Sequence, residues 1–286
     1  MGRNRPITIG RIDYANVWPI YHYFDEERLG CEARVVSNVP SVLNRALREG
    51  ELDLAAISSF AYAQHVEDYY LLPDLSVSAK NRVNSILLFL KKPLEEVCKG
   101  TIALTDTSAT SINLLKIIMT QYYNCAPKYV TMEPNLERML ERADAALLIG
   151  DPAIKASWRD TGCDVIDLAE VWHKWTGFGM TFAVMAVRKE AAALYPERIG
   201  QVHRLFIESK QRSLQDIVPL VNKACGQLGG EPDYWQNYFS QLVYEFGPLQ
   251  QAGLELYFRY ARKLGLLKHE VDIQFWSNQS VAQVKE

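Results

Sequence analysis

Residues 142–156, RADAALLIGDPAIKA, share a scheme with an earlier stretch of the chain, residues 50–63, GELDLAAISSFAYA. In each stretch an aspartate opens a short run of small apolar residues, which leads through a polar turn into an alanine-containing helix start. Uninterrupted apolar strands of this kind are typical of parallel strands that helices cover on both faces. The repeat therefore predicts two α/β units built on the same plan.

Apolar strands alternate with helices on both sides of these stretches. Strands are expected at 7–12, 33–36, 52–57, 71–77 and 85–90, then at 101–104, 129–132 and 145–149, with helices over 40–49, 111–122 and 136–142 between them. After a strand at 180–187, apolar stripes predict helices over 194–212, 214–228, 232–241 and 249–264. We expect a large lobe formed by 1–90 and 185–286, with a helical C-terminal region, and a smaller lobe, 91–184, inserted in it.

The composition narrows the class of protein. The 286 residues are 48% hydrophobic with a net charge of −3, and no basic stripe indicates nucleic-acid binding. No apolar run approaches the roughly 18 residues of a membrane span, and the N-terminal residues lack the apolar core of a secretion signal. The five cysteines are scattered, without a CxxC pair, as expected of reduced, mostly buried thiols in a cytoplasmic protein: Cys31, Cys98, Cys125, Cys163 and Cys225.

Two lobes joined by two crossings enclose a cleft, and ligands of open α/β sheets bind beyond the carboxyl ends of the strands. The turns at these ends are Asp13–Asn16, Ser58–Ser59, Thr105–Ser111 and Gly150–Asp151. The richest is ALTDTSATSINLL (103–115), which carries Thr105, Thr107, Ser108, Thr110 and Ser111 at a helix start. A cap uses one hydroxyl, so the surplus favours a bound carboxylate or phosphate. No GxxxxGK[ST] or GxGxxG pattern indicates a nucleotide.

The sequence around Asp151 allows two interpretations of its role. Asp before Pro152 is a helix-start signal, because the carboxylate accepts free N–H groups and proline needs none. Its place after a strand also puts it at the cleft. We expect both roles, with Asp151 orienting groups rather than transferring a proton, since N–H donors favour its charged form. The five histidines show no metal-ligand spacing, and no GxSxG nucleophile pattern is present, so no metal is expected.

Five blocks occur in the order found in one family: GELDLAAISSFAYA, VNSILLFLKKP (83–93), IALTDTSATSINLLKI (102–117), ALLIGDPAI (146–154) and DLAEVWHKWTGF (167–178). Asn16 in YANVWPI adds an early Asn-x-x-Pro. From about residue 7 to residue 187 the chain resembles the MqnA-type family of menaquinone biosynthesis. One departure is the loop after Thr176-Gly177, where Phe178-Gly179-Met180-Thr181-Phe182-Ala183 replaces the family's Leu-Pro-Phe-Val-Phe-Ala.

The resemblance implies a type II periplasmic-binding-protein-like fold that acts as a chorismate dehydratase, a hydro-lyase of the futalosine pathway. Its product is 3-[(1-carboxyvinyl)oxy]benzoate, and the chemistry uses no cofactor or metal. The resemblance places Asn16 and Ser85 in the catalytic site. Ser58, Thr107, Ser108, Thr110, Ser111, Asp151 and Thr176 are expected to bind the dicarboxylate substrate. The proton acceptor stays open: it is a protein group or a substrate carboxylate.

Two other functions remain to be weighed. The sister enzyme of the pathway makes 1,4-dihydroxy-6-naphthoate from cyclic de-hypoxanthine futalosine and relies on a histidine of the inserted lobe. This chain has no histidine between His65 and His173, which favours the dehydratase. A non-catalytic solute-binding protein would share the fold. A transport receptor of this kind should carry a signal peptide, and a transcriptional regulator should carry a DNA-binding helix-turn-helix.

Overall fold

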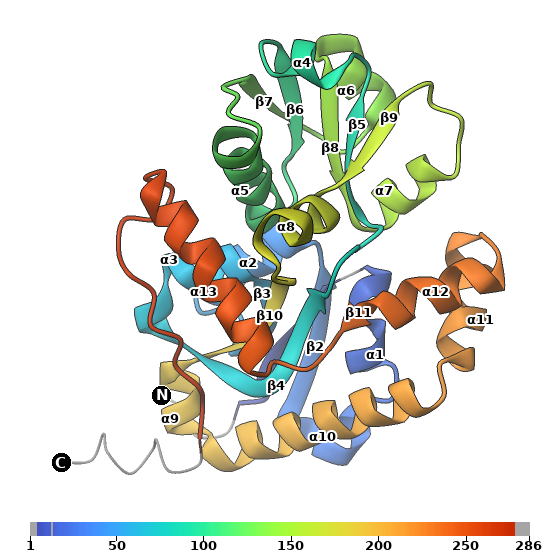
Figure 1. Ribbon diagram of the computed structural model, residues 1–286. Helices are drawn as coiled ribbons and strands as arrows, with labels where there is room; N and C mark the ends of the chain where they lie inside the picture. Colours follow the sequence, from blue (N-terminus) through green and yellow to red (C-terminus); the bar gives the residue numbers. More distant parts are fainter. Residues whose placement is uncertain (1–4, 13, 278–286) are drawn as a thin grey trace.

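The computed structural model describes residues 5–12 and 14–277, and Asp13 of the first predicted turn lies outside them. Two sheets with flanking helices form two α/β lobes, one above the other in Figure 1. The sheet of the first lobe has the order β11-β4-β10-β3-β1-β2. Its strands are β1 (Ile7–Ile12), β2 (Ala33–Asn38), β3 (Leu54–Ser58), β4 (Tyr69–Ala79), β10 (Met180–Arg188) and β11 (Leu242–Val243).

Short helices connect the strands of the first lobe: η1 (Ala15–Val17), α1 (Trp18–Tyr21), η2 (Glu26–Glu32), α2 (Pro40–Arg48), α3 (Ser59–Gln64) and η3 (Val66–Asp68). Strands β1, β2 and β3 are parallel, and β10 runs antiparallel to β3 and β4. Every residue of β3 is buried, as its uninterrupted apolar sequence predicts.

The second sheet has the order β7-β6-β8-β5-β9. Its strands are β5 (Ile86–Leu90), β6 (Thr101–Thr105), β7 (Lys128–Met132), β8 (Ala145–Ile149) and β9 (Asp164–Asp167). Its helices are α4 (Leu94–Val97), α5 (Ala109–Ile117), a π turn η4 (Ile118–Tyr122), α6 (Leu136–Arg142), α7 (Gly150–Ser157) and α8 (Leu168–Thr176). Strand β8 pairs parallel to β6 and antiparallel to β5.

The aspartate of each repeated stretch plays the same structural part in its lobe. The Asp53 carboxylate accepts the N–H of Thr8 in β1 at 2.9 Å, and the Asp144 carboxylate accepts the N–H of Thr101 in β6 at 2.9 Å. The backbone N–H of each aspartate also returns a bond to the same partner, at 2.9 Å in both lobes. The repeat is therefore real, and its aspartates fix the registers of neighbouring strands rather than serve a ligand.

The strand predicted at 85–90 exists, but it pairs in the second sheet, and all of β10 pairs in the first. The chain therefore crosses between the lobes ahead of Ile86 and returns ahead of Met180, not at 91 and 185. The two crossings are tied together, because the Asp167 carboxylate accepts the N–H groups of Val83 at 3.0 Å and Asn84 at 2.7 Å.

The C-terminal region is helical as predicted: α9 (Lys189–Leu194), α10 (Pro196–Gln215), α11 (Val218–Leu228), α12 (Pro232–Gln241) and α13 (Pro248–Lys263). Figure 1 shows α10 beneath the first sheet, while α12 and α13 reach up to the second lobe. Trp158, at the end of α7, packs on Tyr234 of α12 with ring centroids 5.1 Å apart, and Trp175 of α8 packs on Tyr260 of α13 at 4.7 Å. These helices hold the lobes together.

The prediction of reduced thiols is wrong for two cysteines. Cys98, beside α4, and Cys125, after η4, are joined by a disulfide. Cys163 and Cys225 are free and partly exposed, and the side chain of Cys31 lies outside the described residues. Among the described helices, none is both long and apolar enough to cross a membrane.

Candidate functional site

A cavity lies between the two lobes, at the carboxyl ends of their parallel strands. The space between its walls, open mouth included, is about 400 Å³, of which about 30 Å³ is accessible to the centre of a water molecule. Its walls are Ile12, Tyr14, Asn16, Pro40, Ser58, Phe182 and Ala183 from the first lobe, and Ser85, Ile86, Ser108, Ser111, Ile149 and Gly150 from the crossing and the second lobe. None of these lining residues carries a charged side chain, so the cavity offers a ligand hydroxyl, amide and backbone groups.

Five residues predicted for the site meet in this cavity: Asn16, Ser58, Ser85, Ser108 and Ser111. The four serines are at most 7% exposed. The five residues come from four separate segments that the fold brings together: the turn after β1, the end of β3, the start of β5 and the first turn of α5. A buried hydroxyl needs partners, so such a cluster suits a polar ligand.

Ser58 faces the cavity as a hydrogen-bond donor. Its Oγ accepts the N–H of Ala61 at 3.3 Å, as the cap of α3, and the Asn44 amide Nδ2 at 3.2 Å. The Asn44 orientation is fixed, because its Oδ1 accepts the N–H of Ser58. With two bonds accepted, the hydroxyl proton of Ser58 is left to donate to an acceptor in the cavity.

Ser108 and Ser111 form the opposite wall at the start of α5. Ser108 caps the helix by accepting the N–H of Ser111 at 3.4 Å, and the two hydroxyls lie 3.2 Å apart. One hydroxyl donates to the other, so one proton of the pair remains for a ligand. The exposed N–H groups and the dipole of this nine-residue helix also favour a negative charge here.

Asn16 brings an unsatisfied acceptor to the cavity. Its Oδ1 is buried and has no hydrogen-bond partner among the described residues. A buried amide oxygen without a donor carries a desolvation penalty, which a ligand O–H or N–H removes on binding. This oxygen is therefore available to accept a hydrogen bond from a ligand in the cavity.

The three threonines expected at the site do not line the cavity. The Thr107 hydroxyl lies 2.8 Å from that of Thr105, and Thr176 Oγ1 donates to the Trp172 carbonyl at 2.8 Å. Thr110 links the lobes instead: its Oγ1 accepts the N–H of Phe60 at 2.9 Å and lies 3.2 Å from Ser59 Oγ. Because Ser59 donates its own proton to the Thr181 carbonyl, Thr110 is the donor in that pair.

Asp151 departs from the expected cap. Helix α7 begins at Gly150, so Asp151 lies inside the first turn and not before it. Its Oδ1 accepts the N–H of Ala15, in the other lobe, at 3.1 Å. The carboxylate therefore joins the turn after β1 to α7, one residue from Asn16, and it is not among the residues that line the cavity.

Gly150 and Tyr14 form a further contact between the lobes that the sequence did not reveal. Gly150 has φ +63°, and a Cβ there would lie 2.9 Å from the Tyr14 ring. The Gly150 N–H also donates to the Ser85 carbonyl at 2.7 Å. A larger residue would separate the lobes at the cavity. The glycine that follows the apolar strand was the signal that could have indicated this close approach.

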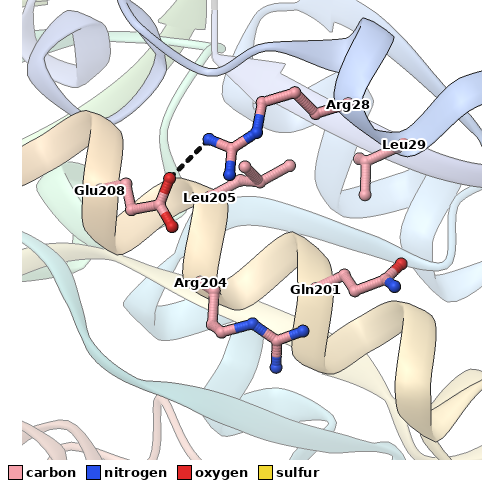
Figure 2. A pocket seen from close by; sticks show the side chains of 6 residues that line it. All are labelled: Arg28, Leu29, Gln201, Arg204, Leu205 and Glu208. Carbon is pink, nitrogen blue, oxygen red and sulfur yellow. Dashed lines mark hydrogen bonds and ion pairs between the residues drawn. The ribbon is translucent and has the colours of Figure 1, made fainter.

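Other pockets lack this convergence. The one in Figure 2 lies on the surface of the first lobe, between η2 and α10, and its Arg28 is already paired with Glu208 at 2.5 Å. Another lies beside the crossings, lined among others by Lys80, His173 and Phe178. Within the described residues no three His, Cys, Asp or Glu side chains gather as a metal site.

Known proteins share both the sequence and the fold. The family described as "Menaquinone biosynthesis" matches residues 7–263. The chorismate dehydratase of Thermus thermophilus is 34% identical over 277 residues, which cover 92% of this chain and 96% of that protein.

Two solved structures share the fold at lower identity. Protein AF1704 of Archaeoglobus fulgidus is 18% identical with a TM-score of 0.75, covering 93% of this chain and 100% of the other. The periplasmic aliphatic sulphonate binding protein of Escherichia coli is 15% identical with a TM-score of 0.66, covering 97% and 98%. The fold is therefore periplasmic-binding-protein-like, and the chain belongs to the menaquinone biosynthesis family.

Proposed function

We propose that this protein is a chorismate dehydratase, a carbon–oxygen lyase that converts chorismate to 3-[(1-carboxyvinyl)oxy]benzoate and water. The observation that carries the proposal is the interlobe cavity, where hydroxyl donors lie on opposite walls and the buried Asn16 oxygen has no donor among the described residues. Similarity to the Thermus thermophilus chorismate dehydratase supports the choice of substrate.

The two carboxylates of chorismate match the two groups of donors. Ser58 offers its proton from the first lobe, and the Ser108–Ser111 pair offers one at the start of α5. Binding each carboxylate to a different lobe would fix the ring between Asn16 and Ser85. Four further residues do not contact the substrate and instead hold the turns and the lobes in place: Thr107, Thr110, Asp151 and Thr176.

The reaction removes one ring proton and the C4 hydroxyl, and the ring becomes aromatic. The C4–O bond breaks with its electron pair on oxygen, and the released hydroxide takes up the proton removed from the ring to form water. Asn16 is suited to accept the hydrogen of the C4 hydroxyl and hold it in place for departure. Among the described residues, none that lines the cavity carries a carboxylate or an imidazole, which supports a substrate carboxylate as the acceptor of the ring proton.

The lobe division follows the sheets. We place the inserted lobe between the two crossings, with the first lobe formed by the rest of the chain. The partner is a small dicarboxylate, and the biosynthetic role fits a protein of the cytoplasm.

Incubation with chorismate, followed by mass spectrometry and ultraviolet absorption, tests the proposal. The expected result is loss of one water and appearance of an aromatic product. A parallel incubation with cyclic de-hypoxanthine futalosine tests the sister activity. Conversion of that compound alone would identify the sister enzyme, and binding of chorismate without conversion would identify a solute-binding protein.

A further inference from the structure

Ser85 is fixed on the cavity wall by its backbone neighbours. The N–H groups of Val83 and Asn84 donate to Asp167, and the Ser85 carbonyl accepts the N–H of Gly150. Asn84 has a φ of +55°, in the left-handed region, and its Nδ2 donates to Gln241 of α12 at 2.6 Å. With the backbone held on both sides, the remaining freedom is the direction of the Ser85 hydroxyl.

That direction is set by a residue of the C-terminal region. Tyr238 of α12 donates its hydroxyl proton to Ser85 Oγ at 3.2 Å, and Ser85 Oγ donates to the Val83 carbonyl at 3.2 Å. A serine oxygen has one proton and two lone pairs. One lone pair is taken by Tyr238 and the proton by Val83, so Ser85 presents a lone pair to the cavity.

We propose that Tyr238 is a positioning residue, which makes Ser85 a hydrogen-bond acceptor for the C4 hydroxyl of the substrate. The inference rests on the proposed function, because chorismate with both carboxylates ionised has that hydroxyl as its one O–H donor. The single proton of the C4 hydroxyl is then shared between the Ser85 and Asn16 oxygens, which fix the direction of that hydroxyl, while the carboxylates are directed to the donors Ser58, Ser108 and Ser111.

The surroundings of Tyr238 suit a permanent donor. Its side chain is 1% exposed, and burial raises the pKa of its phenol well above the usual range. The phenol therefore stays protonated at neutral pH and can donate to Ser85. Tyr238 touches Ser85 and is not itself part of the cavity wall.

The test is Tyr238→Phe, with Tyr244→Phe as the matched control. Tyr244 is also fully buried, and its hydroxyl has no partner among the described residues. We expect Tyr238→Phe to lower kcat about threefold to tenfold, the usual effect of one neutral hydrogen bond. The KM should change little, because the carboxylate donors remain. Tyr244→Phe should keep wild-type kcat and KM.

A double-mutant cycle separates positioning from a general structural effect. If Tyr238 acts through Ser85, the Tyr238→Phe change should have no further effect in a Ser85→Ala background. Crystal structures of the two tyrosine variants supply a readout independent of activity: the Ser85 hydroxyl should change its rotamer in Tyr238→Phe and keep it in Tyr244→Phe.

An unchanged Ser85 rotamer together with wild-type kcat in Tyr238→Phe would overturn the inference. Equal losses in the wild-type and Ser85→Ala backgrounds would also overturn it, since Tyr238 would then act elsewhere. A wild-type protein that leaves chorismate unchanged would refute the proposed function instead, and the rotamer comparison would still decide whether Tyr238 orients Ser85.

Discussion

Substitution of Asn16 is the most direct mutational test of the proposed chemistry. Replacing Asn16 with leucine keeps a similar size and removes the amide oxygen that awaits a donor in the cavity. By analogy with the loss of one polar group that stabilises a transition state, kcat should fall roughly a hundredfold or more. Steady-state kinetics and thermal unfolding check the result. The control is Asn113→Leu, because Asn113 bonds within its own helix at 2.9 Å.

Ser111 tests the carboxylate site at the start of α5. Ser111→Ala removes one of the paired hydroxyls and leaves the helix cap of Ser108 in place. Loss of a hydrogen bond to a charged acceptor should weaken chorismate binding about tenfold to a hundredfold. Calorimetric titration gives the affinity. Ser157→Ala is the matched control, since Ser157 bonds to its own helix at 2.8 Å, and equal affinities in the two variants would place the carboxylate elsewhere.

At the scale of elements, the starts of α3 and α5 are joined across the lobes by Thr110. Thr110→Val keeps the shape and leaves the buried N–H of Phe60 without its acceptor. We expect a loss of about 1–3 kcal/mol in the free energy of unfolding, the penalty for an unsatisfied buried group. Denaturant titration measures it. The Thr107 hydroxyl bonds locally, so Thr107→Val should lose less free energy of unfolding. Equal losses in the two variants would show that the Thr110 bond between the lobes adds no stability of its own.

The helices and strands also show how much of the fold can be predicted from the sequence. The apolar runs at β3, β6 and β8 predict strands that are covered on both faces, as the structure has them. The sheet to which β5 belongs was not predictable, since an apolar sequence does not determine which strand it pairs with. The Ser85–Tyr238 contact spans 153 residues and leaves no local pattern. Hydroxyls in one turn look alike in sequence, yet Ser111 lines the cavity and Thr110 joins the lobes.

For the whole molecule, three histidines should make the free energy of unfolding depend on pH. Burial lowers the pKa of His22, His65 and His203 below the model-peptide value of 6.5. The unfolded chain then binds protons more readily than the folded protein as pH falls. Stability should be fully present above about pH 6.5 and decrease toward pH 5. Thermal unfolding across this range tests the direction, and His203→Gln should reduce the slope. A constant unfolding temperature would contradict it.

The most direct test of the interlobe site is a crystal structure of the protein with 3-[(1-carboxyvinyl)oxy]benzoate bound. The account predicts the aromatic ring between Asn16 and Ser85, with one carboxylate at Ser58 and the other at Ser108 and Ser111. A ligand bound instead in the surface pocket of Figure 2, or in the interlobe cavity with neither carboxylate on these serines, would contradict it.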